Sequence, residues 1–306
     1  MKILMVSPSF MPALNYGGTT RSVYEICKSL GKNNNLLVLT TNLNDDCKLS
    51  VVPDVLQECD SIPVIYHDVH IFKKMFCSFR FLLNIFNEVP QSDVIHIQSV
   101  FFLPAIFTAV VCMVYKKPFY VSTRGAVGDA VINAKSSVFK KIWIRLLAWP
   151  LFQGCDGLHV TSNWEFMGLK QLGLDFGKCS LIPNGVSAPQ ADLVNFETEI
   201  SGEDYILYVG RLSPEKGLDL LLRAFKKSKV DTNLIIAGDD SNSHGLALKE
   251  LAKQLGMSHK VFFIGQVDEA KWSLYKDAQC LLLTSHSENF GNVILEAMAM
   301  GTPVIV

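Results

Sequence analysis

The sequence lacks the paired cysteines and the long hydrophobic runs that define several common classes of protein. Its 8 cysteines are scattered and include no CxxC pair, so neither a disulfide framework nor a zinc site is indicated and a reducing cytosol is expected. The most apolar stretch, residues 100–115, contains Pro104 and is shorter than the ~20 residues that a membrane-spanning helix needs. It predicts a helix buried between a sheet and neighbouring helices. The apolar N-terminal run is too short for a secretory signal, which predicts a cytoplasmic protein with a buried first strand.

An excess of either charge is also lacking. The chain has 28 basic and 29 acidic residues, for a formal net charge of -1. Proteins dedicated to nucleic acids normally carry a basic excess, so we expect no nucleic-acid partner. With 306 residues, of which 49% are hydrophobic, the chain is long and apolar enough for about two folded domains.

What the sequence does contain is a regular alternation of short apolar runs and longer helical patterns. Continuous apolar strands indicate burial on both faces of a sheet. The alternation predicts an α/β fold of two Rossmann-like domains, each with a doubly wound parallel sheet. The polar, acidic stretch 188–204 predicts the link between a domain at 1–187 and a second at 188–306. An order such as 3-2-1-4-5-6 would leave the last strand as a bare edge, so we expect the second domain to be incomplete.

The expected elements follow from these runs. In the first domain we expect strands at 3–6, 36–40, 94–97, 119–122 and 157–160, and helices at 20–30 and 136–152. In the second domain we expect strands at 205–209, 234–237, 261–264, 280–283 and 303–306. Its helices should begin near residue 218 and cover 246–255, 271–276 and 292–300.

The strongest chemical signal is the loop and helix that follow the strand at 280–283. Backbone amides of Phe290, Gly291 and Asn292 lie at the expected helix N-terminus, which suits a phosphate. Glu288 and Glu296 flank it, and a carboxylate can accept from two neighbouring sugar hydroxyls. The alternative is one glutamate that caps the helix and another that is solvated on its face.

A second signal follows the strand at 205–209. Arg211 and Lys216 leave the carboxyl end of this strand, beside the loop after 280–283 in a doubly wound sheet. A guanidinium and an ammonium there would neutralise a diphosphate without a metal ion. The alternative is a surface loop in which Glu215 pairs with one of the two cations.

In the first domain, Gly17 and Gly18 precede a helix whose cap is expected at Thr19 or Thr20. This glycine-flanked helix start suits a phosphate or an acceptor group. The GxGxxG pattern and acidic residue that a nicotinamide cofactor needs are both missing.

Together these segments resemble the retaining nucleotide-sugar glycosyltransferases of family four, which have the GT-B architecture. The resemblance rests on MKILMVSPSFMPALNYGGTTRSVYEI, LIPNGV, YVGRLSPEKGLDLLLRAF, LIIAGDD, VFFIGQV and SENFGNVILEAMAMGTPVIV, in this order. It implies sugar transfer from a nucleoside diphosphate sugar with retention and without an obligatory metal. It also implies that Arg211, Lys216 and amides near Phe290 and Gly291 hold the donor diphosphate. Glu296 would hold the ribose and Glu288 would face the sugar, while Gly17 and Gly18 would line the diphosphate and acceptor side.

The chain departs from the family pattern in two places. Many members have a histidine where this chain has Arg124, before Gly125. Arg124 could contact the donor sugar or an anionic acceptor, but it stays protonated and cannot be a general base. Asp129 is the nearest candidate base, although an aspartate there is more often a helix cap; His96 and His159 are expected in strands or the core. The family also continues beyond the equivalent of Val306, so we expect a truncated chain.

We therefore predict a hexosyltransferase-type enzyme that acts on a saccharide or lipid-linked saccharide acceptor in cell-surface polysaccharide synthesis. The alternatives are an inactive sugar-nucleotide-binding fragment and a nucleotide-sugar epimerase. Basic and aromatic residues also intermingle near residue 75: Lys73, Lys74, Arg80, Phe72, Phe76 and Phe79. They suit either peripheral contact with an anionic membrane or an ordinary helix with its aromatic rings packed inward, which is the preferred interpretation.

Overall fold

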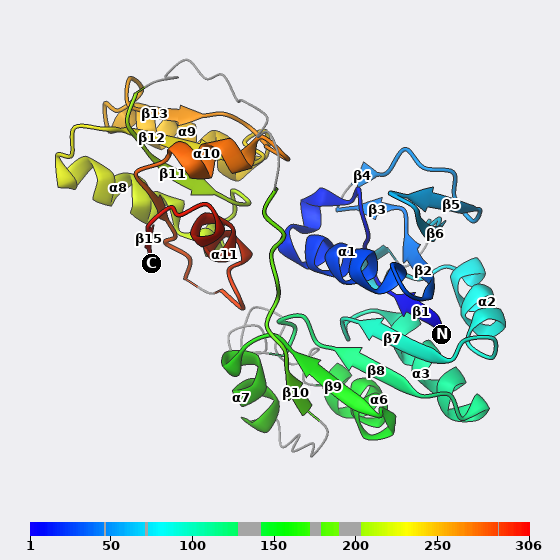
Figure 1. Ribbon diagram of the computed structural model, residues 1–306. Helices are drawn as coiled ribbons and strands as arrows, with labels where there is room; N and C mark the ends of the chain where they lie inside the picture. Colours follow the sequence, from blue (N-terminus) through cyan, green and yellow to red (C-terminus); the bar gives the residue numbers. More distant parts are fainter. Residues whose placement is uncertain (46, 71–72, 128–141, 172–178, 190–202, 287) are drawn as a thin grey trace. The chain divides into compact units, whose positions relative to one another are not determined.

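The computed structural model describes the chain except residues 46, 71–72, 128–141, 172–178, 190–202 and 287 (Figure 1). The chain divides into two compact units, Met1–Asn184 and Gly185–Val306. Most of the stretch 188–204, which the sequence predicts as a link, lies outside the described residues.

The first unit is built on an eight-stranded sheet in the order β10-β9-β8-β7-β1-β2-β6-β5. Its strands are β1 (Lys2–Val6), β2 (Asn35–Thr41), β5 (Leu56–Cys59), β6 (Ile62–His67), β7 (Val94–Gln98), β8 (Phe119–Ser122), β9 (Gly157–Val160) and β10 (Cys179–Leu181). Neighbouring strands are parallel, except that β5 and β6 are antiparallel. A separate antiparallel pair joins β3 (Leu43–Asn44) to β4 (Cys47–Lys48).

Helices cover both faces of this sheet. They are α1 (Gly18–Gly31), α2 (Phe79–Glu88), α3 (Leu103–Tyr115), α6 (Trp149–Gly154) and α7 (Asn163–Gln171). Successive side chains of a strand point to opposite faces. Accordingly, Ile3 and Met5 of β1 pack with Val23 of α1, whereas Leu4 and Val6 belong to the core that includes α2, α3 and α6.

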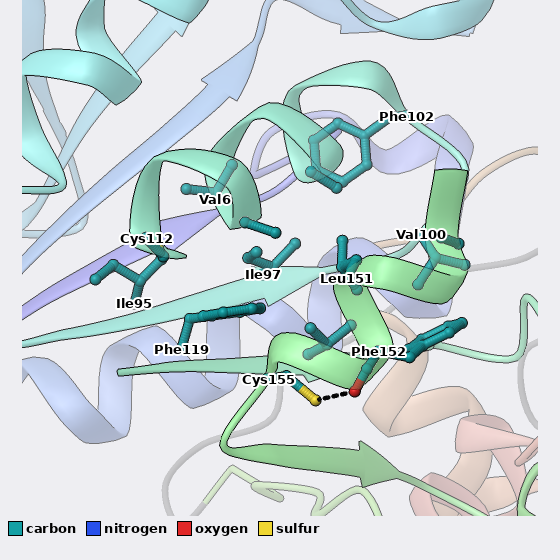
Figure 2. Close-up of a cluster of buried hydrophobic side chains, with 14 of the residues drawn as sticks. Val6, Ile95, Ile97, Val100, Phe102, Cys112, Phe119, Leu151, Phe152 and Cys155 are labelled. Carbon is teal, nitrogen blue, oxygen red and sulfur yellow. Dashed lines mark hydrogen bonds between the residues drawn. The ribbon is translucent and has the colours of Figure 1, made fainter. Parts of the chain in front are cut away.

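Figure 2 shows part of the second of these cores. Ile95 and Ile97 of β7 and Phe119 of β8 lie beside Leu151 and Phe152 of α6 in the same buried cluster. Cys155, after α6, donates from its Sγ to the carbonyl oxygen of Phe152 at 3.1 Å. The cluster thus packs β7 and β8 against α6.

The helix expected at 136–152 is present in its described part: residues 142–154 are helical throughout, with a π-helical turn η3 (Ile144–Ala148) before α6. Two other expectations for the first unit need correction. The helix expected to be buried within 100–115 is α3, and only one of its faces is buried, because Val110, Met113, Val114 and Tyr115 are exposed. No α-helix covers residues 73–78, since Lys73–Met75 form a short 3₁₀ helix, η2, and Ser78 caps α2.

The basic and aromatic residues near residue 75 therefore do not form one helix. Phe76 packs on the ring of Tyr16, with 5.8 Å between the ring centroids. Phe79 is 76% exposed, so its ring does not pack inward as the preferred interpretation expected. Phe72 lies outside the described residues.

The second unit is a five-stranded, fully parallel sheet in the order β13-β12-β11-β14-β15. Its elements are β11 (Tyr205–Val209), α8 (Leu218–Ser228), β12 (Asn233–Ala237), α9 (Ser243–Gln254), β13 (Val261–Phe263), α10 (Lys271–Asp277), β14 (Cys280–Leu282), α11 (Asn292–Ala299) and β15 (Val304–Ile305). Leu234 and Ile236 of β12 pack with the core that includes α8 and α9, and Ile235 packs with that of α10 and α11.

These two units confirm the predicted fold class of two Rossmann-like domains with mostly parallel sheets. Every strand expected in the second unit is present within about two residues of its expected bounds, which is ordinary precision for sequence-based boundaries. All eight cysteines are free. Within the described residues, none of the helices is both long and apolar enough to span a bilayer, and no group of three or more histidine, cysteine, aspartate or glutamate side chains could hold a metal ion.

Candidate functional site

Two loops of the second unit lie against each other at the carboxyl edge of its sheet. One follows β11 and the other follows β14, and these strands are parallel neighbours with Leu207 opposite Leu281. Hydrogen bonds join the loops: the amide of His286 donates to the carbonyl oxygen of Glu215 at 2.9 Å. The hydroxyl of Thr284 lies 3.1 Å from the carbonyl oxygens of both Lys216 and Gly217. The sequence signals at 211–216 and 288–296 thus belong to one surface.

Gly217 makes this close approach of the loops possible. Its φ is +63°, and a Cβ atom at this position would lie 2.4 Å from the carbonyl oxygen of Thr284. An L-residue would therefore be strained in its backbone and would also clash with the neighbouring loop.

Lys216 and Glu288 form an ion pair between the two loops. The Nζ of Lys216 lies 2.6 Å from Oε2 of Glu288, and their side chains are 15% and 30% exposed. Ser285 also donates to Oε2, at 3.3 Å. Oε1 of Glu288 has no hydrogen-bond partner among the described residues. This oxygen remains able to accept a hydrogen bond from a ligand, and the lysine is held beside it.

Arg211 lies on the same loop as Lys216 and is exposed. Its Nη2 lies 3.5 Å from Oε1 of Glu215, so the pairing that the sequence offered as an alternative is present. Burial opposes ionisation of Glu215. Nevertheless a backbone hydrogen bond and the charges of Arg211 and Lys216 hold its pKa below the usual value. The contact is long and exposed, so it stabilises the loop by at most ~1 kcal/mol and leaves the guanidinium accessible.

Helix α11 begins beside this ion pair. It starts at Asn292, as predicted, and Gly291 is its N-cap with a φ of +71°. Gly291 has no side chain with which to cap the helix. A Cβ atom there would lie 2.9 Å from Cδ1 of Ile294. Phe290 precedes it and is partly buried. The N-terminus of α11 is the positive end of the helix dipole, and it directly follows the loop that carries Glu288.

Glu296 lies deeper than the sequence predicts. It is 7% exposed and its carboxylate contacts helix α10: Oε1 forms an ion pair with Lys271, and Oε2 accepts from the hydroxyl of Tyr275 at 2.9 Å. The solvated position that was the alternative is therefore wrong. Sequence reasoning missed Lys271 and Tyr275. Their i, i+4 spacing on one helix was the available signal, because such residues share a face.

In the first unit, Gly17 and Gly18 lie at the start of α1, but the cap differs from the expected one. Gly17, with a φ of +70°, is the N-cap, and Gly18 is the first helical residue. Thr20, one of the two expected caps, is buried within the helix and its hydroxyl lies 2.9 Å from that of Ser9. The helix therefore begins before both threonines, and Gly17 supplies an N-cap with a φ near +70°, which glycine adopts readily.

Arg124 follows β8 and has a φ of +51°. Its Nε donates to Oε1 of Gln98 at 2.8 Å, and its Nη1 donates to Oδ1 of Asn184 at 3.1 Å. The loop around it is fixed by the buried carboxylate of Glu165, a residue that sequence reasoning missed. This carboxylate accepts from the hydroxyl of Thr123 and the amide of Gly125. Asp129, the candidate base, lies outside the described residues.

His96 and His159 occupy strands β7 and β9. The hydroxyl of Ser122 joins them, at 2.7 Å from Nε2 of His96 and 2.8 Å from Nδ1 of His159. Burial lowers the pKa of both imidazoles, and the charge of Arg124 adds to the effect; that of His96 falls to about 3. Both rings are therefore neutral at physiological pH.

Comparison with known proteins agrees with this architecture. The family model of Glycosyltransferase Family 4 matches residues 16–188, and that of Glycosyl transferases group 1 matches residues 191–306. Among solved structures, Anabaena HepE in complex with UDP and glucose has a TM-score of 0.73 at 19% identity, covering 99% of this chain and 80% of that one. Sucrose-phosphate synthase from Thermosynechococcus elongatus has the same TM-score and coverage at 20% identity. These likenesses establish the fold.

Curated relatives are more similar in sequence but match over shorter segments. An uncharacterized glycosyltransferase of Methanocaldococcus jannaschii is 34% identical over 169 residues, which cover 51% of this chain and 43% of that protein. Mannosylfructose-phosphate synthase of Agrobacterium fabrum is 36% identical over 175 residues, covering 51% and 38%. The matched segments thus span less than half of each relative. Because the model of the family covers more than half of the 306 residues, the chain belongs to Glycosyltransferase Family 4.

Proposed function

We propose that this protein transfers a hexosyl group from a nucleoside diphosphate sugar to a saccharide acceptor, with retention of the anomeric configuration. The observation that carries the proposal is the ion pair of Lys216 and Glu288 at the start of α11, 2.6 Å long and partly open to solvent. It combines a cation for phosphate oxygens with a carboxylate oxygen for a sugar hydroxyl. Family membership supports the reaction class, and a neighbour in fold was solved with UDP-glucose.

In this proposal the donor binds to the second unit. Arg211 and Lys216 neutralise the diphosphate, and amides at Phe290, Gly291 and Asn292 donate to its oxygens. Oε1 of Glu288 accepts from a hydroxyl of the sugar. Glu296 accepts from the ribose with the lone pairs that Lys271 and Tyr275 leave available. Gly17 and Gly18 line the acceptor side of the first unit.

The chemistry requires that negative charge on the departing diphosphate be stabilised. As the bond from the anomeric carbon to the phosphate oxygen breaks, the carbon becomes oxocarbenium-like and the oxygen gains charge next to the two cations. The acceptor hydroxyl attacks on the same face and gives its proton to that oxygen. The products are the glycoside and a protonated nucleoside diphosphate. Two cations and a helix N-terminus supply this stabilisation, so we propose that no metal ion is required.

The test is a thermal-shift screen with UDP, GDP and ADP, followed by transfer assays with the corresponding sugars. We expect a stabilising diphosphate, transfer that persists with EDTA, and a product with the donor's anomeric configuration by proton NMR. An inverted product would refute retention, and activity lost with EDTA and restored by a divalent ion would refute the metal-free assignment. Epimerised donor without any acceptor would favour an epimerase. No response to any diphosphate would favour an inactive fragment.

We further propose that the first unit contacts an anionic lipid surface, where a lipid-linked saccharide of cell-surface polysaccharide synthesis could serve as acceptor. Exposed apolar side chains gather on the packed helices α2 and α3: Phe79, Leu83, Phe86, Val110, Met113, Val114 and Tyr115. The rings of Phe86 and Tyr115 lie 5.9 Å apart, so the two helices present one apolar surface. Exposed cations accompany it, namely Lys73, Lys74, Arg80 and Lys116.

Vesicle flotation tests this surface. The full chain should float with phosphatidylglycerol vesicles and less with phosphatidylcholine, because basic groups favour anionic lipids. Replacing Phe79 and Val114 together with serine should abolish flotation. Leu220→Ser, at an exposed position of α8 in the second unit, serves as the matched control. Wild-type protein that stays unbound to both vesicles would exclude the membrane contact.

A further inference from the structure

The guanidinium of Arg124 has one end bonded to protein and one end without a partner. Nε and Nη1 donate to the side-chain oxygens of Gln98 and Asn184, both of which are neutral amides. Nη2 is buried and has no hydrogen-bond partner in the described part of the chain. Leaving a buried donor unpaired costs free energy, and the cost is larger for a charged group. Such an arrangement is uncommon unless a ligand completes it.

The charge of Arg124 is not neutralised by a directly bonded carboxylate. Glu165 is the nearby acidic group, but its oxygens are engaged by the hydroxyl of Thr123 and by the amides of Gly125 and Thr161. Glu165 thus holds the loop in place while no hydrogen bond links it to the guanidinium. Burial lowers the pKa of Arg124 to about 10, against the opposing effect of Glu165. The side chain therefore stays charged at neutral pH.

Apart from Glu165, the surrounding polar groups supply no negative charge. Nε2 of His159 lies 2.9 Å from the carbonyl oxygen of Ile182, to which it must donate. In the neutral ring Nδ1 then accepts from the hydroxyl of Ser122, so Ser122 accepts in turn from Nε2 of His96. Both imidazoles are neutral and supply no counter-charge. Gln98 ends β7 and Arg124 follows β8, so the guanidinium lies at the carboxyl ends of these strands, where ligands bind in open parallel sheets.

We propose that the first unit contains an anion-binding subsite at Arg124, which recognises a phosphate monoester or carboxylate on the acceptor. This inference rests on the proposed transferase function and adds the chemical class of the acceptor. A neutral hydroxyl would satisfy the hydrogen bond of Nη2 but not the charge, whereas an anionic oxygen satisfies both. The hydrogen bonds of Nε and Nη1 hold the guanidinium of Arg124 in one orientation, so its side chain loses little rotational freedom when an anion binds.

Two single variants of the full chain distinguish the anion-binding subsite at Arg124 from the proposed diphosphate site at Lys216. Thermal unfolding is followed with UDP, inorganic phosphate, glucose 6-phosphate, glucuronate and glucose. We expect glucose 6-phosphate or glucuronate to bind wild-type protein at least tenfold more tightly than glucose. Arg124→Gln should lose this preference and keep its response to UDP. Lys216→Gln should keep the preference and lose its response to UDP. Comparison of the phosphate and carboxylate probes identifies which anion is preferred.

Inorganic phosphate also fits the proposed diphosphate site, so its effect is measured in the Lys216→Gln background. A phosphate-induced shift there that disappears when Arg124→Gln is added supports the subsite. Arg145→Gln, at an exposed position of the same unit, controls for general charge and should change nothing. An anion response that is unaltered by Arg124→Gln overturns the inference, whatever the result with UDP. If Arg124→Gln does not fold, Arg124→Met removes the charge with a side chain that still fills space, and an unaltered anion response in that variant overturns the inference equally.

Discussion

The Nζ of Lys216 lies 2.6 Å from Oε2 of Glu288, although 72 residues separate them in the chain. The pair joins the loops after β11 and β14, and hydrogen bonds from the hydroxyl of Thr284 and the amide of His286 also hold those loops together. A partly exposed ion pair contributes about 1 kcal/mol or less to stability. Its residues can therefore be tested for binding and catalysis with little risk of unfolding the protein.

Lys216→Ala should lower turnover about 100-fold, the size expected when one group that stabilises transition-state charge is removed. The free energy of unfolding should be nearly unchanged. Initial rates with saturating donor and urea unfolding check the two parts. Lys227→Ala, on the exposed surface of α8, is the matched control. A variant with wild-type turnover would contradict the role assigned to Lys216.

Glu288→Gln should have a different signature. Removing the carboxylate charge leaves Lys216 without its counter-ion, so a nucleoside diphosphate should bind as tightly as in wild type or more tightly. Sugar transfer should fall by at least tenfold, because the amide is a weaker partner for the sugar hydroxyl. Calorimetry with UDP and transfer assays measure both. Weaker UDP binding combined with normal transfer would disprove this division of labour.

Gly217→Ala should destabilise the protein by more than about 2 kcal/mol, because positive-φ strain adds to a clash with a neighbouring backbone. Gly301→Ala separates these effects: Gly301 has a φ of +79°, yet no atom lies within 4 Å of its Cβ position. The free energy of unfolding of Gly301→Ala should fall by only about 1 kcal/mol. Urea unfolding measures both variants, and equal losses would show that contact with Thr284 adds no cost.

Lys271→Met should cost about 3 kcal/mol, because it leaves the buried carboxylate of Glu296 without its cation. Adding Glu296→Gln to Lys271→Met should recover part of this loss by removing the uncompensated charge. The double variant is predicted to unfold at a higher urea concentration than Lys271→Met alone. Additive losses in this double-mutant cycle would mean that the pair is not coupled.

Acid should weaken the fold through His96. Burial, with Arg124 and His159 nearby, lowers its pKa to about 3, whereas an unfolded histidine titrates near ~6.5. Below pH ~6.5 the unfolded chain binds a proton that the folded chain does not, so stability falls as pH falls toward the folded pKa. At pH 5 the shifted pKa of His96 lowers the free energy of unfolding by roughly 2 kcal/mol relative to neutral pH.

His96→Gln tests this linkage, because it removes the titrating group and keeps a donor for Ser122. The difference in unfolding free energy between pH 7 and pH 5 should shrink by that amount. His259→Gln, at an exposed position, should leave the difference as in wild type. An undiminished difference in His96→Gln would assign the acid sensitivity to other groups.

The architecture and the positions of the loops that follow β11 and β14, which carry the proposed donor site, are predictable from the sequence alone. Apolar runs such as 205–209 and 280–283 follow from local pattern, and parallel pairing of their strands brings the residues after each run to one edge. The sequence did not predict the antiparallel strand β5 or the turns at 73–78. Short edge strands and turns carry little apolar periodicity, so nothing local distinguishes them.

The partners of individual side chains, by contrast, depend on how distant segments pack together. Glu296 lies against Lys271 and Tyr275, Glu165 holds the loop of Arg124, and helix α3 leaves Val114 70% exposed. Each outcome depends on which elements pack against that residue, and these elements are far apart in the chain. A local pattern specifies which residues can be buried, whereas the burial of a charge and the atoms that compensate it are set by long-range packing.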